Sequence, residues 1–125
     1  RLPHDKNLRE INFGDWELRT FNDVEADGPE RIRAYWEKPG DVAPPNGESW
    51  NAVRQRVDGA IDRYLDHGHQ DLIVVAHFGV ILTQVQRALA ISAYEAFSHR
   101  IENLSVTVLQ KHHDDWTVAH INHTP

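Results

Sequence analysis

One short segment constrains the fold of this chain more than any other. Residues 72–76 read Leu-Ile-Val-Val-Ala and are apolar at every position. A strand that is apolar on both faces is typical of a parallel sheet with helices covering each side. Gly79 ends the run, and an apolar helical stripe over residues 80–89 follows it. This succession predicts an α/β fold with a buried strand at 72–76.

The remaining patterns predict helices before this strand and a hairpin after it. Ser49 is a suitable N-cap, and apolar residues follow it at helical spacing as far as Tyr64. Ser92 and Glu95 form a capping-box pair that predicts a short helix reaching Phe97. The other expected elements are a loop over 1–19, a helix over 29–37, a loop over 39–47, and strands over 104–110 and 116–121 with a turn at 112–115.

This inventory leaves the predicted sheet short of strands. A strand buried on both faces needs a neighbouring strand on each side, whereas the two late strands look like an antiparallel hairpin. We therefore expect partner strands from an upstream segment or from another chain. The chain begins at Arg1 rather than at a methionine, which fits a missing upstream segment.

Composition narrows the class of protein. The chain carries 13 Lys and Arg against 19 Asp and Glu, a formal net charge of −6, which argues against a nucleic-acid binder. It has no cysteine, which fits a cytoplasmic protein, and no apolar run long enough to span a bilayer. Nine histidines occur, but none stands at a recognised zinc spacing with a third ligand, so neither a metal nor another cofactor is expected.

Three positions could carry chemistry. His77 directly follows the predicted strand, where ligands of open α/β sheets bind, although a histidine there could equally cap the strand. Glu10 stands beside Ile11, so partial desolvation would suit it to donate a proton near neutral pH, although a solvated loop carboxylate is the plainer interpretation. Glu48 precedes the Ser49 cap, where capping explains much of the pattern.

These motifs occur in one order in a known family. They read Leu8-Arg-Glu-Ile-Asn-Phe-Gly-Asp-Trp-Glu17, Pro45-Asn-Gly-Glu-Ser49 and Val74-Val-Ala-His-Phe-Gly-Val-Ile81. The chain resembles the phosphoglycerate mutase-like branch of the histidine phosphatase superfamily from about Leu8 to Asn122, and most of all its small bacterial phosphatases, such as alpha-ribazole phosphatase. The resemblance implies a three-layer α/β/α sandwich with a mostly parallel sheet, and residues 1–125 as one domain of this kind, truncated at its N-terminus.

The resemblance also implies a mechanism and roles for residues. A histidine attacks phosphorus, a carboxylic acid protonates the leaving oxygen, and arginines and a second histidine stabilise the phosphoryl oxygens. By resemblance Glu10 is the acid, His77 is the second histidine, and the backbone N–H of Phe78 contacts the phosphate. The pocket edge is expected to hold Glu48, Trp50 and Asn103.

One part of the family pattern is missing. The nucleophile belongs to an Arg-His-Gly motif, and no Arg-His-Gly occurs in these 125 residues. We expect the parent protein to hydrolyse small phosphate monoesters without metal, to bind neither nucleic acid nor membrane, and to be compatible with a homodimer. Two alternatives remain: a non-catalytic interaction module that kept the second half of the fold, and a phosphoglycerate mutase.

Overall fold

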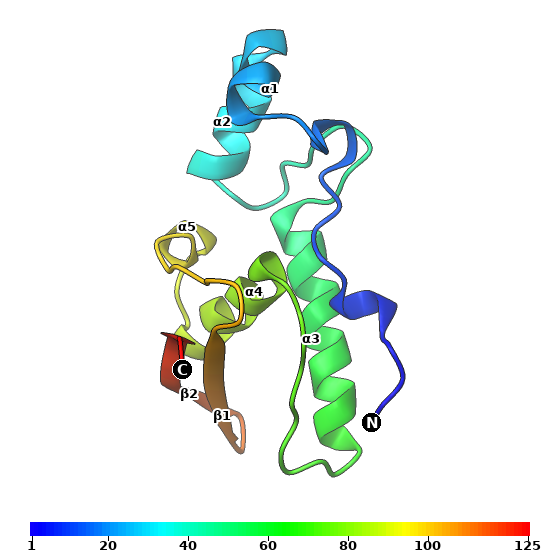
Figure 1. Ribbon diagram of the computed structural model, residues 1–125, viewed down its shortest axis with the longest axis vertical. Helices are drawn as coiled ribbons and strands as arrows, with labels where there is room; N and C mark the ends of the chain where they lie inside the picture. The colour runs from blue at the N-terminus through cyan, green and yellow to red at the C-terminus, as the bar shows by residue number, and fades with distance from the viewer.

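The computed structural model describes all 125 residues, which form two short 3-10 turns, five α-helices and one β-hairpin (Figure 1). The molecule is elongated, and the long helix α3 runs through much of its length. In chain order the elements are η1 (Lys6–Leu8), η2 (Gly14–Trp16), α1 (Phe21–Asp27), α2 (Pro29–Glu37), α3 (Trp50–Asp66), α4 (Phe78–Leu89), α5 (Ala93–Ala96), β1 (Val106–His112) and β2 (Asp115–His123).

Helices α3 and α5 begin at the residues that their capping patterns predict. The Ser49 side chain accepts a hydrogen bond from the Ala52 N–H at 3.1 Å, which satisfies one unpaired donor at the start of α3. Ser92 and Glu95 form the predicted capping box of α5, although α5 ends at Ala96, one residue before Phe97. Helix α2 is also confirmed over its predicted range.

Helix α1 is an element that the patterns above did not predict. It begins after Thr20, whose side chain forms a capping box with Asp23. Helices α1 and α2 pack on each other, and the pair projects from one end of the molecule (Figure 1). Aromatic rings connect α2 to the main body, because the Trp36 ring lies 5.3 Å from Phe97, which in turn lies 4.7 Å from Trp50.

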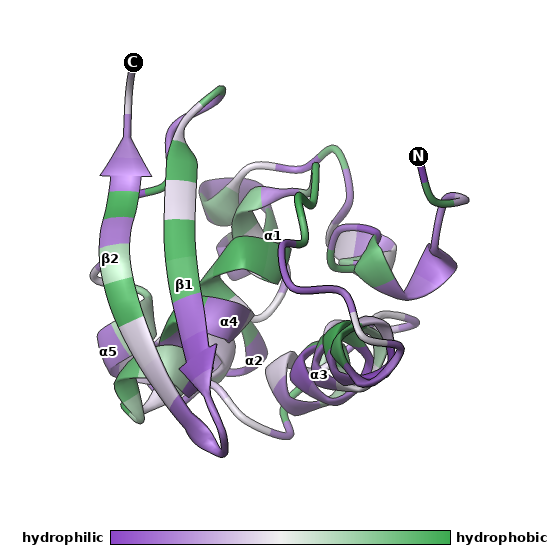
Figure 2. Cartoon of the chain, turned by 90° about the horizontal axis from the view of Figure 1, so that it is seen from below, coloured by the Kyte–Doolittle hydropathy of each residue, from purple (hydrophilic) through white to green (hydrophobic).

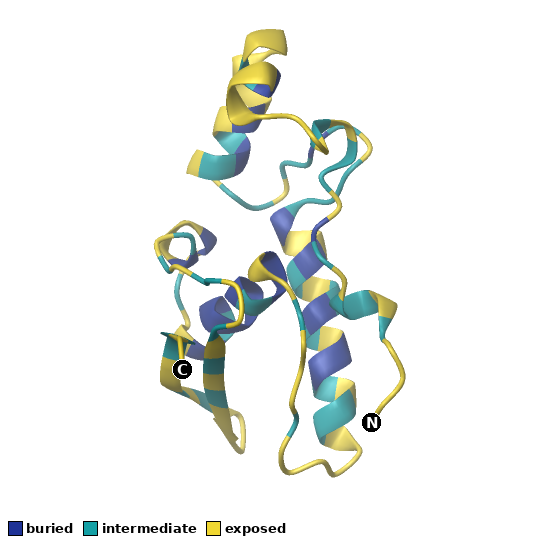
Figure 3. Cartoon of the chain, viewed as in Figure 1, coloured by how far each residue is buried: buried dark blue, intermediate teal, exposed yellow.

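Helix α4 forms the centre of the main body. It packs against α3, against both strands of the hairpin and against α5. Figure 3 shows buried residues along α4 and along one side of α3. Two polar residues of α4 are buried and paired, since Gln86 accepts a hydrogen bond from the Trp50 indole at 2.7 Å and Gln84 donates one to Asp58 at 2.7 Å.

The predicted buried strand over residues 72–76 is wrong for this chain. The segment forms no strand, and the side chains of Ile73 and Val75 are 94% and 96% exposed. Leu72 and Ala76, at the two ends of the segment, contact the core, whereas Val74 between them is exposed. The segment leads from the end of α3 to the start of α4 without a neighbouring strand (Figure 1). It cannot form a ladder because these 125 residues supply it with no partner.

The only sheet is therefore the antiparallel pair of β1 and β2, and the expected mostly parallel three-layer sheet is not present within this chain. β1 begins and ends two residues later than the predicted range 104–110, and β2 begins one residue before and ends two residues after the predicted range 116–121. His112 pairs with Asp115 to close a tight turn. His113, in this turn, has a φ of 57°, the left-handed conformation that tight hairpins require. Figure 2 shows this turn as hydrophilic, whereas much of β1 is apolar.

The helices are also short or polar. None combines the length and the apolar composition that crossing a bilayer would require.

Candidate functional site

Glu10 lies in the loop between η1 and η2, and its carboxylate contacts the first turn of α4. One oxygen, Oε2, accepts a hydrogen bond from the Gly79 N–H at 3.1 Å, and Oε1 accepts one from the Ile11 N–H at 3.0 Å. Glu10 is partly buried, and Ile11 beside it belongs to the core. Two residues that are 69 positions apart in the sequence are thereby joined at one end of a helix.

This contact depends on the absence of a side chain at Gly79. A Cβ atom there would lie 2.6 Å from Glu10 Oε1 and 2.7 Å from Ile11 Cδ1. Both distances are shorter than van der Waals contact allows, so a larger residue would force the loop away from α4. The glycine of the His-Phe-Gly motif is thus the point where the loop and the helix approach each other most closely.

His77 is the N-cap residue of α4, with extended backbone angles of φ −126° and ψ 165°. Its carbonyl accepts a hydrogen bond from the Ile81 N–H at 2.9 Å, while its side chain makes no capping bond and is exposed. Phe78, the first residue of α4, is also exposed. The N–H groups of the first helical turn have no partner within the helix and favour an anion. His77, the Phe78 N–H and the Glu10 carboxylate therefore belong to the same end of α4.

Glu48 performs a structural task in this arrangement. Its carboxylate forms an ion pair with Arg56 and accepts a hydrogen bond from the Asn12 N–H at 2.9 Å. The hydrogen bonds from Arg56 hold the pKa of Glu48 below its ordinary value, with the Asn12 N–H adding to the effect and partial burial opposing it. Both carboxylate oxygens of Glu48 are thus engaged with this chain, and the predicted position at a pocket edge stays a prediction.

Trp50 and Asn103 occupy different environments from each other. The Trp50 side chain is 1% exposed and its indole N–H is bound to Gln86, so the side chain belongs to the core, and the predicted position at a pocket edge stays a prediction. Trp50 is drawn inward because it is the first residue on the buried face of α3. Asn103 is exposed in the turn before β1, and its side chain makes no hydrogen bond with the Glu10 loop or with α4.

Tyr35 is a buried aromatic residue whose hydroxyl is affected by the charges of Glu48 and Glu10. Its side chain is fully buried, and its hydroxyl has no hydrogen-bond partner. Burial raises the pKa of Tyr35, and the charges of Glu48 and Glu10 raise it further. The phenol therefore stays protonated, and the buried Tyr35 side chain is uncharged.

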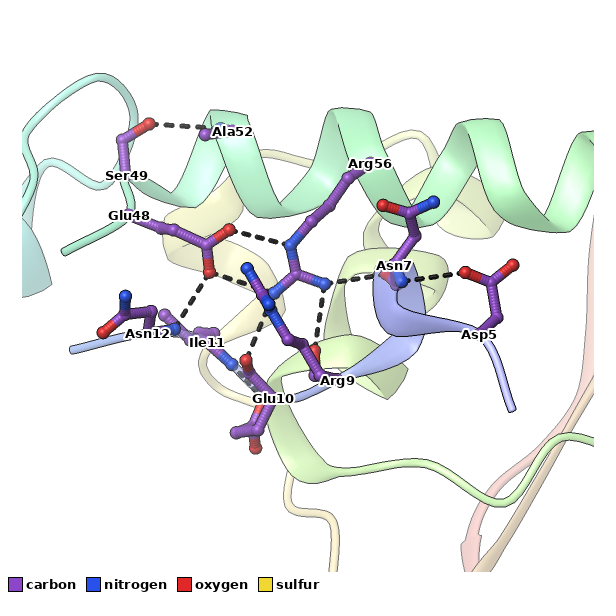
Figure 4. A network of polar contacts seen from close by, with 10 residues as sticks. All are labelled: Asp5, Asn7, Arg9, Glu10, Ile11, Asn12, Glu48, Ser49, Ala52 and Arg56. Atoms are coloured by element: carbon purple, nitrogen blue, oxygen red, sulfur yellow. Dashed lines mark hydrogen bonds and ion pairs between the residues drawn. The ribbon is translucent and has the colours of Figure 1, made fainter. Parts of the chain in front are cut away.

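Arg56 is the residue that sequence patterns missed. It lies on α3 and donates hydrogen bonds both to Glu48 and to the backbone of the loop that carries Glu10 (Figure 4). The only signal in the sequence is its place between the buried residues Val53 and Val57, where a charged side chain needs partners.

Two hollows on the surface lie elsewhere. Hollows of about 280 Å³ and about 350 Å³ flank helices α1 and α2, and neither is lined by Glu10 or His77. No group of three or more His, Asp or Glu side chains gathers in a way that could hold a metal ion. Glu10 and His77 therefore lie at the start of α4, apart from these two hollows.

Comparison with known proteins gives one consistent result. The family described as the histidine phosphatase superfamily (branch 1) matches residues 1–124. Adenosylcobalamin/alpha-ribazole phosphatase of Escherichia coli (strain K12) is 32% identical over 96 residues, which are 76% of this chain and 47% of that protein. The same-named protein of Salmonella typhimurium is 34% identical over 97 residues, which are 76% of this chain and 48% of that protein. The chain thus spans about half the length of these relatives.

Solved structures agree with the sequence relatives. Bacillus stearothermophilus YhfR superposes with a TM-score of 0.85 at 26% identity, over 97% of this chain and 61% of that one. The alpha-ribazole phosphatase from Shigella flexneri gives a TM-score of 0.77 at 27% identity, over 94% of this chain and 59% of that one. Mycobacterial glucosyl-3-phosphoglycerate phosphatase in complex with VO3 gives 0.80 at 25% identity, over 96% and 64%.

Proposed function

The chain belongs to the histidine phosphatase superfamily (branch 1), and from this premise we propose that its parent protein hydrolyses small phosphate monoesters through a phosphohistidine. The relatives support a phosphatase, since the names of those in Escherichia coli, Salmonella and Shigella all specify phosphatase activity. In this proposal residues 1–125 form part of one histidine phosphatase domain, and the nucleophilic histidine lies outside them.

One observation carries the assignment of roles. The Glu10 carboxylate bonds to the Gly79 N–H in the first turn of α4, two residues after His77. Glu10 and His77 are thus placed at the same helix N-terminus, which favours a phosphoryl group through its N–H donors and its dipole. A carboxyl group, an imidazole and anion-binding backbone N–H groups are the kinds of group that cleavage of a phosphate ester uses around the phosphorus atom.

The proposed reaction has two steps. In the first, a neutral imidazole from outside this chain attacks phosphorus, the bond from phosphorus to the ester oxygen breaks, and Glu10 gives its proton to the departing alcohol. In the second, water attacks the phosphorus atom of the phosphohistidine, Glu10 takes a proton from that water, the P–N bond breaks to return the neutral imidazole, and inorganic phosphate leaves. His77 and the Phe78 N–H stabilise the negative charge on the phosphoryl oxygens in both steps.

The test uses the complete protein with phenyl phosphate in the presence of a metal chelator. We expect Glu10→Gln to lower kcat/KM by about 100-fold or more, because general acid catalysis contributes about that much. We expect His77→Ala to lower kcat by roughly 100-fold, through loss of charge stabilisation. Rapid quenching during turnover should trap a phosphoenzyme that acid destroys and alkali preserves, which is the behaviour of a phosphohistidine.

Matched controls separate chemistry from general damage. Glu30→Gln on α2 and His69→Ala after α3 change exposed residues that make no ion pair or side-chain hydrogen bond, so both should keep wild-type rates. Wild-type rates in both Glu10→Gln and His77→Ala would refute the assignment. A complete protein that is inert toward phenyl phosphate and alpha-ribazole phosphate would favour the non-catalytic alternative instead.

A further inference from the structure

The guanidinium group of Arg56 uses all of its hydrogen-bond donors within this chain. Its Nε and Nη2 donate to the two carboxylate oxygens of Glu48 at 2.8 and 3.0 Å. Its Nη1 donates to the carbonyl oxygens of Asn7 and Arg9 at 2.7 and 2.9 Å, and Nη2 also donates to the Glu10 carbonyl at 3.2 Å. Arginine has five N–H donors, so none is left for a substrate or for water.

Glu48 extends this network to the other side of Glu10. One of its oxygens accepts from the Asn12 N–H at 2.9 Å, and the Glu48 N–H donates to the Asn12 carbonyl at 2.8 Å. The backbone before Glu10 is thus held by Arg56, and the backbone after it is held by Glu48. Figure 4 shows the two side chains between α3 and the loop, with the loop backbone gathered around the guanidinium group.

The network is partly shielded from solvent, because four of the five Arg56 hydrogen bonds are partly buried. The Arg56 side chain is 14% exposed, so its bonds are weakly screened and its loss would leave three carbonyls and a carboxylate without their partner. The loop has little regular structure of its own around Glu10, where only 3-10 turns of three residues each flank it. Its path past the start of α4 is therefore set by Arg56 rather than by local backbone bonds.

We propose that Arg56 is the positioning residue that fixes the Glu10 loop from α3, so that the Glu10 carboxylate is held at the N-terminus of α4 beside His77. The inference rests on the proposed function for its catalytic meaning, because it takes Glu10 as the acid. Arg56 itself touches neither the substrate nor the reacting atoms. Arg56 keeps the Glu10 carboxyl group at the distance from the leaving oxygen that proton transfer requires. The rate of proton transfer depends steeply on this distance.

The kinetic test compares two leaving groups in the complete protein. Phenolate needs a proton as it leaves phenyl phosphate, whereas p-nitrophenolate leaves p-nitrophenyl phosphate readily without one. We expect Arg56→Lys to lower kcat/KM for phenyl phosphate by about 10- to 100-fold and for p-nitrophenyl phosphate by less than about 3-fold. Glu10→Gln should show the same dependence on the leaving group. The double variant should have a kcat/KM only slightly below that of Glu10→Gln alone, because both changes remove proton donation by Glu10.

The matched control is Arg63→Lys. Arg63 lies two turns further along α3 and also ties the N-terminal segment to the helix, through an ion pair with Asp5 at 2.7 Å, but it does not contact the Glu10 loop. It should leave the ratio of the two kcat/KM values unchanged. Glu48→Gln keeps an acceptor for Arg56 and is a milder second variant, expected to show a smaller loss with the same leaving-group dependence.

A structural readout distinguishes failure of this inference from failure of the proposed function. The Gly79 amide signal in an NMR spectrum reports on its bond to the Glu10 carboxylate, and Glu10→Gln should shift it. Arg56→Lys should shift it as well and speed its hydrogen exchange, while Arg63→Lys should not. An unchanged Gly79 amide in Arg56→Lys overturns the positioning role. A shifted amide with no loss of hydrolysis in either Arg56→Lys or Glu10→Gln supports the positioning and overturns the proposed function.

Discussion

At the scale of single residues, the space around Gly79 decides where the Glu10 carboxylate lies. Glu10 and Ile11 approach the Gly79 Cα so closely that a methyl group there would overlap both side chains. Ile11 is a buried member of the core, so it has little room to yield, whereas the Glu10 carboxylate is partly buried and has more. Glycine is therefore required at this position because no space is left for a Cβ atom. Its backbone conformation does not require glycine.

Gly79→Ala tests this requirement. We expect the free energy of unfolding to fall by about 1–3 kcal/mol, the usual cost of overpacking, and the bond between the Gly79 N–H and Glu10 to be lost. Urea denaturation measures the first effect. Gly59→Ala in α3 is the control, because no atom lies within 4 Å of the added methyl, and it should raise stability by about 0.5–1 kcal/mol. Equal stability of the two variants would contradict the clash.

At the scale of elements, α3 holds the irregular N-terminal segment through two carboxylates. Asp5 bonds to Arg63 and Tyr64 of α3, and Glu48 bonds to Arg56. The Asn7 N–H, with help from Tyr64 and Arg63, holds the pKa of Asp5 below its ordinary value of 3.8, and Arg56 holds the pKa of Glu48 below 4.5. Both groups favour the folded state when they are ionised.

The contacts of Asp5 and Glu48 with α3 should therefore weaken in acid. Because both pKa values are lower in the folded state than in the unfolded chain, the stabilisation is complete above about pH 4.5 and is lost as pH falls through the folded values. We expect the free energy of unfolding, followed by urea denaturation from pH 7 to pH 3, to fall below about pH 4.5. Glu48→Gln should be less stable at pH 7 and should flatten this fall.

The control for acid sensitivity is Asp114→Asn in the exposed hairpin turn, which forms no ion pair. It should reproduce the wild-type pH dependence. A Glu48→Gln profile that runs parallel to the wild type would show that this carboxylate does not stabilise the fold through its charge.

At the scale of the whole molecule, the main body is organised around α4, and its one sheet has two strands. Residues 72–76 place two apolar side chains, Ile73 and Val75, in solvent beside a backbone without ladder bonds. Leu104, before β1, is also fully exposed. Extended apolar segments with unpaired N–H and C=O groups pair readily with other chains. The matched relatives are about twice as long as this chain, so the segment that corresponds to residues 72–76 can be compared in those longer proteins.

We expect these 125 residues on their own to self-associate as concentration rises. Replacing Ile73 and Val75 together with lysine should reduce the association, because charges on an unpaired strand oppose pairing with another chain. Sedimentation velocity over a concentration series measures the change. Leu18→Lys, at another fully exposed leucine far from this segment, should have little effect. A wild-type chain that stays monomeric throughout would contradict the expectation.

Elements with local signals could be predicted from the amino-acid sequence alone. The caps Ser49 and Ser92 and the helical spacing after Ser49 placed α3 and α5, because capping and periodicity depend on residues within a few turns. The order of motifs was enough to identify the family and to single out Glu10 and His77, whose catalytic roles stay predictions. The Thr20 and Asp23 pair carried an equally local signal for α1 that was not used.

The environments of residues 72–76, Trp50 and Arg56 could not be predicted from local patterns, because each depends on partners far away in the sequence. Residues 72–76 read as a buried strand, yet burial of a strand needs neighbours that no local pattern guarantees, and Ile73 and Val75 remain exposed. The partner of the buried Trp50 indole N–H is Gln86, 36 residues away, which no local pattern specifies. The role of Arg56 was also invisible beforehand, because its acceptors lie up to 49 residues away and include backbone carbonyls, which every residue possesses and no side-chain pattern reveals.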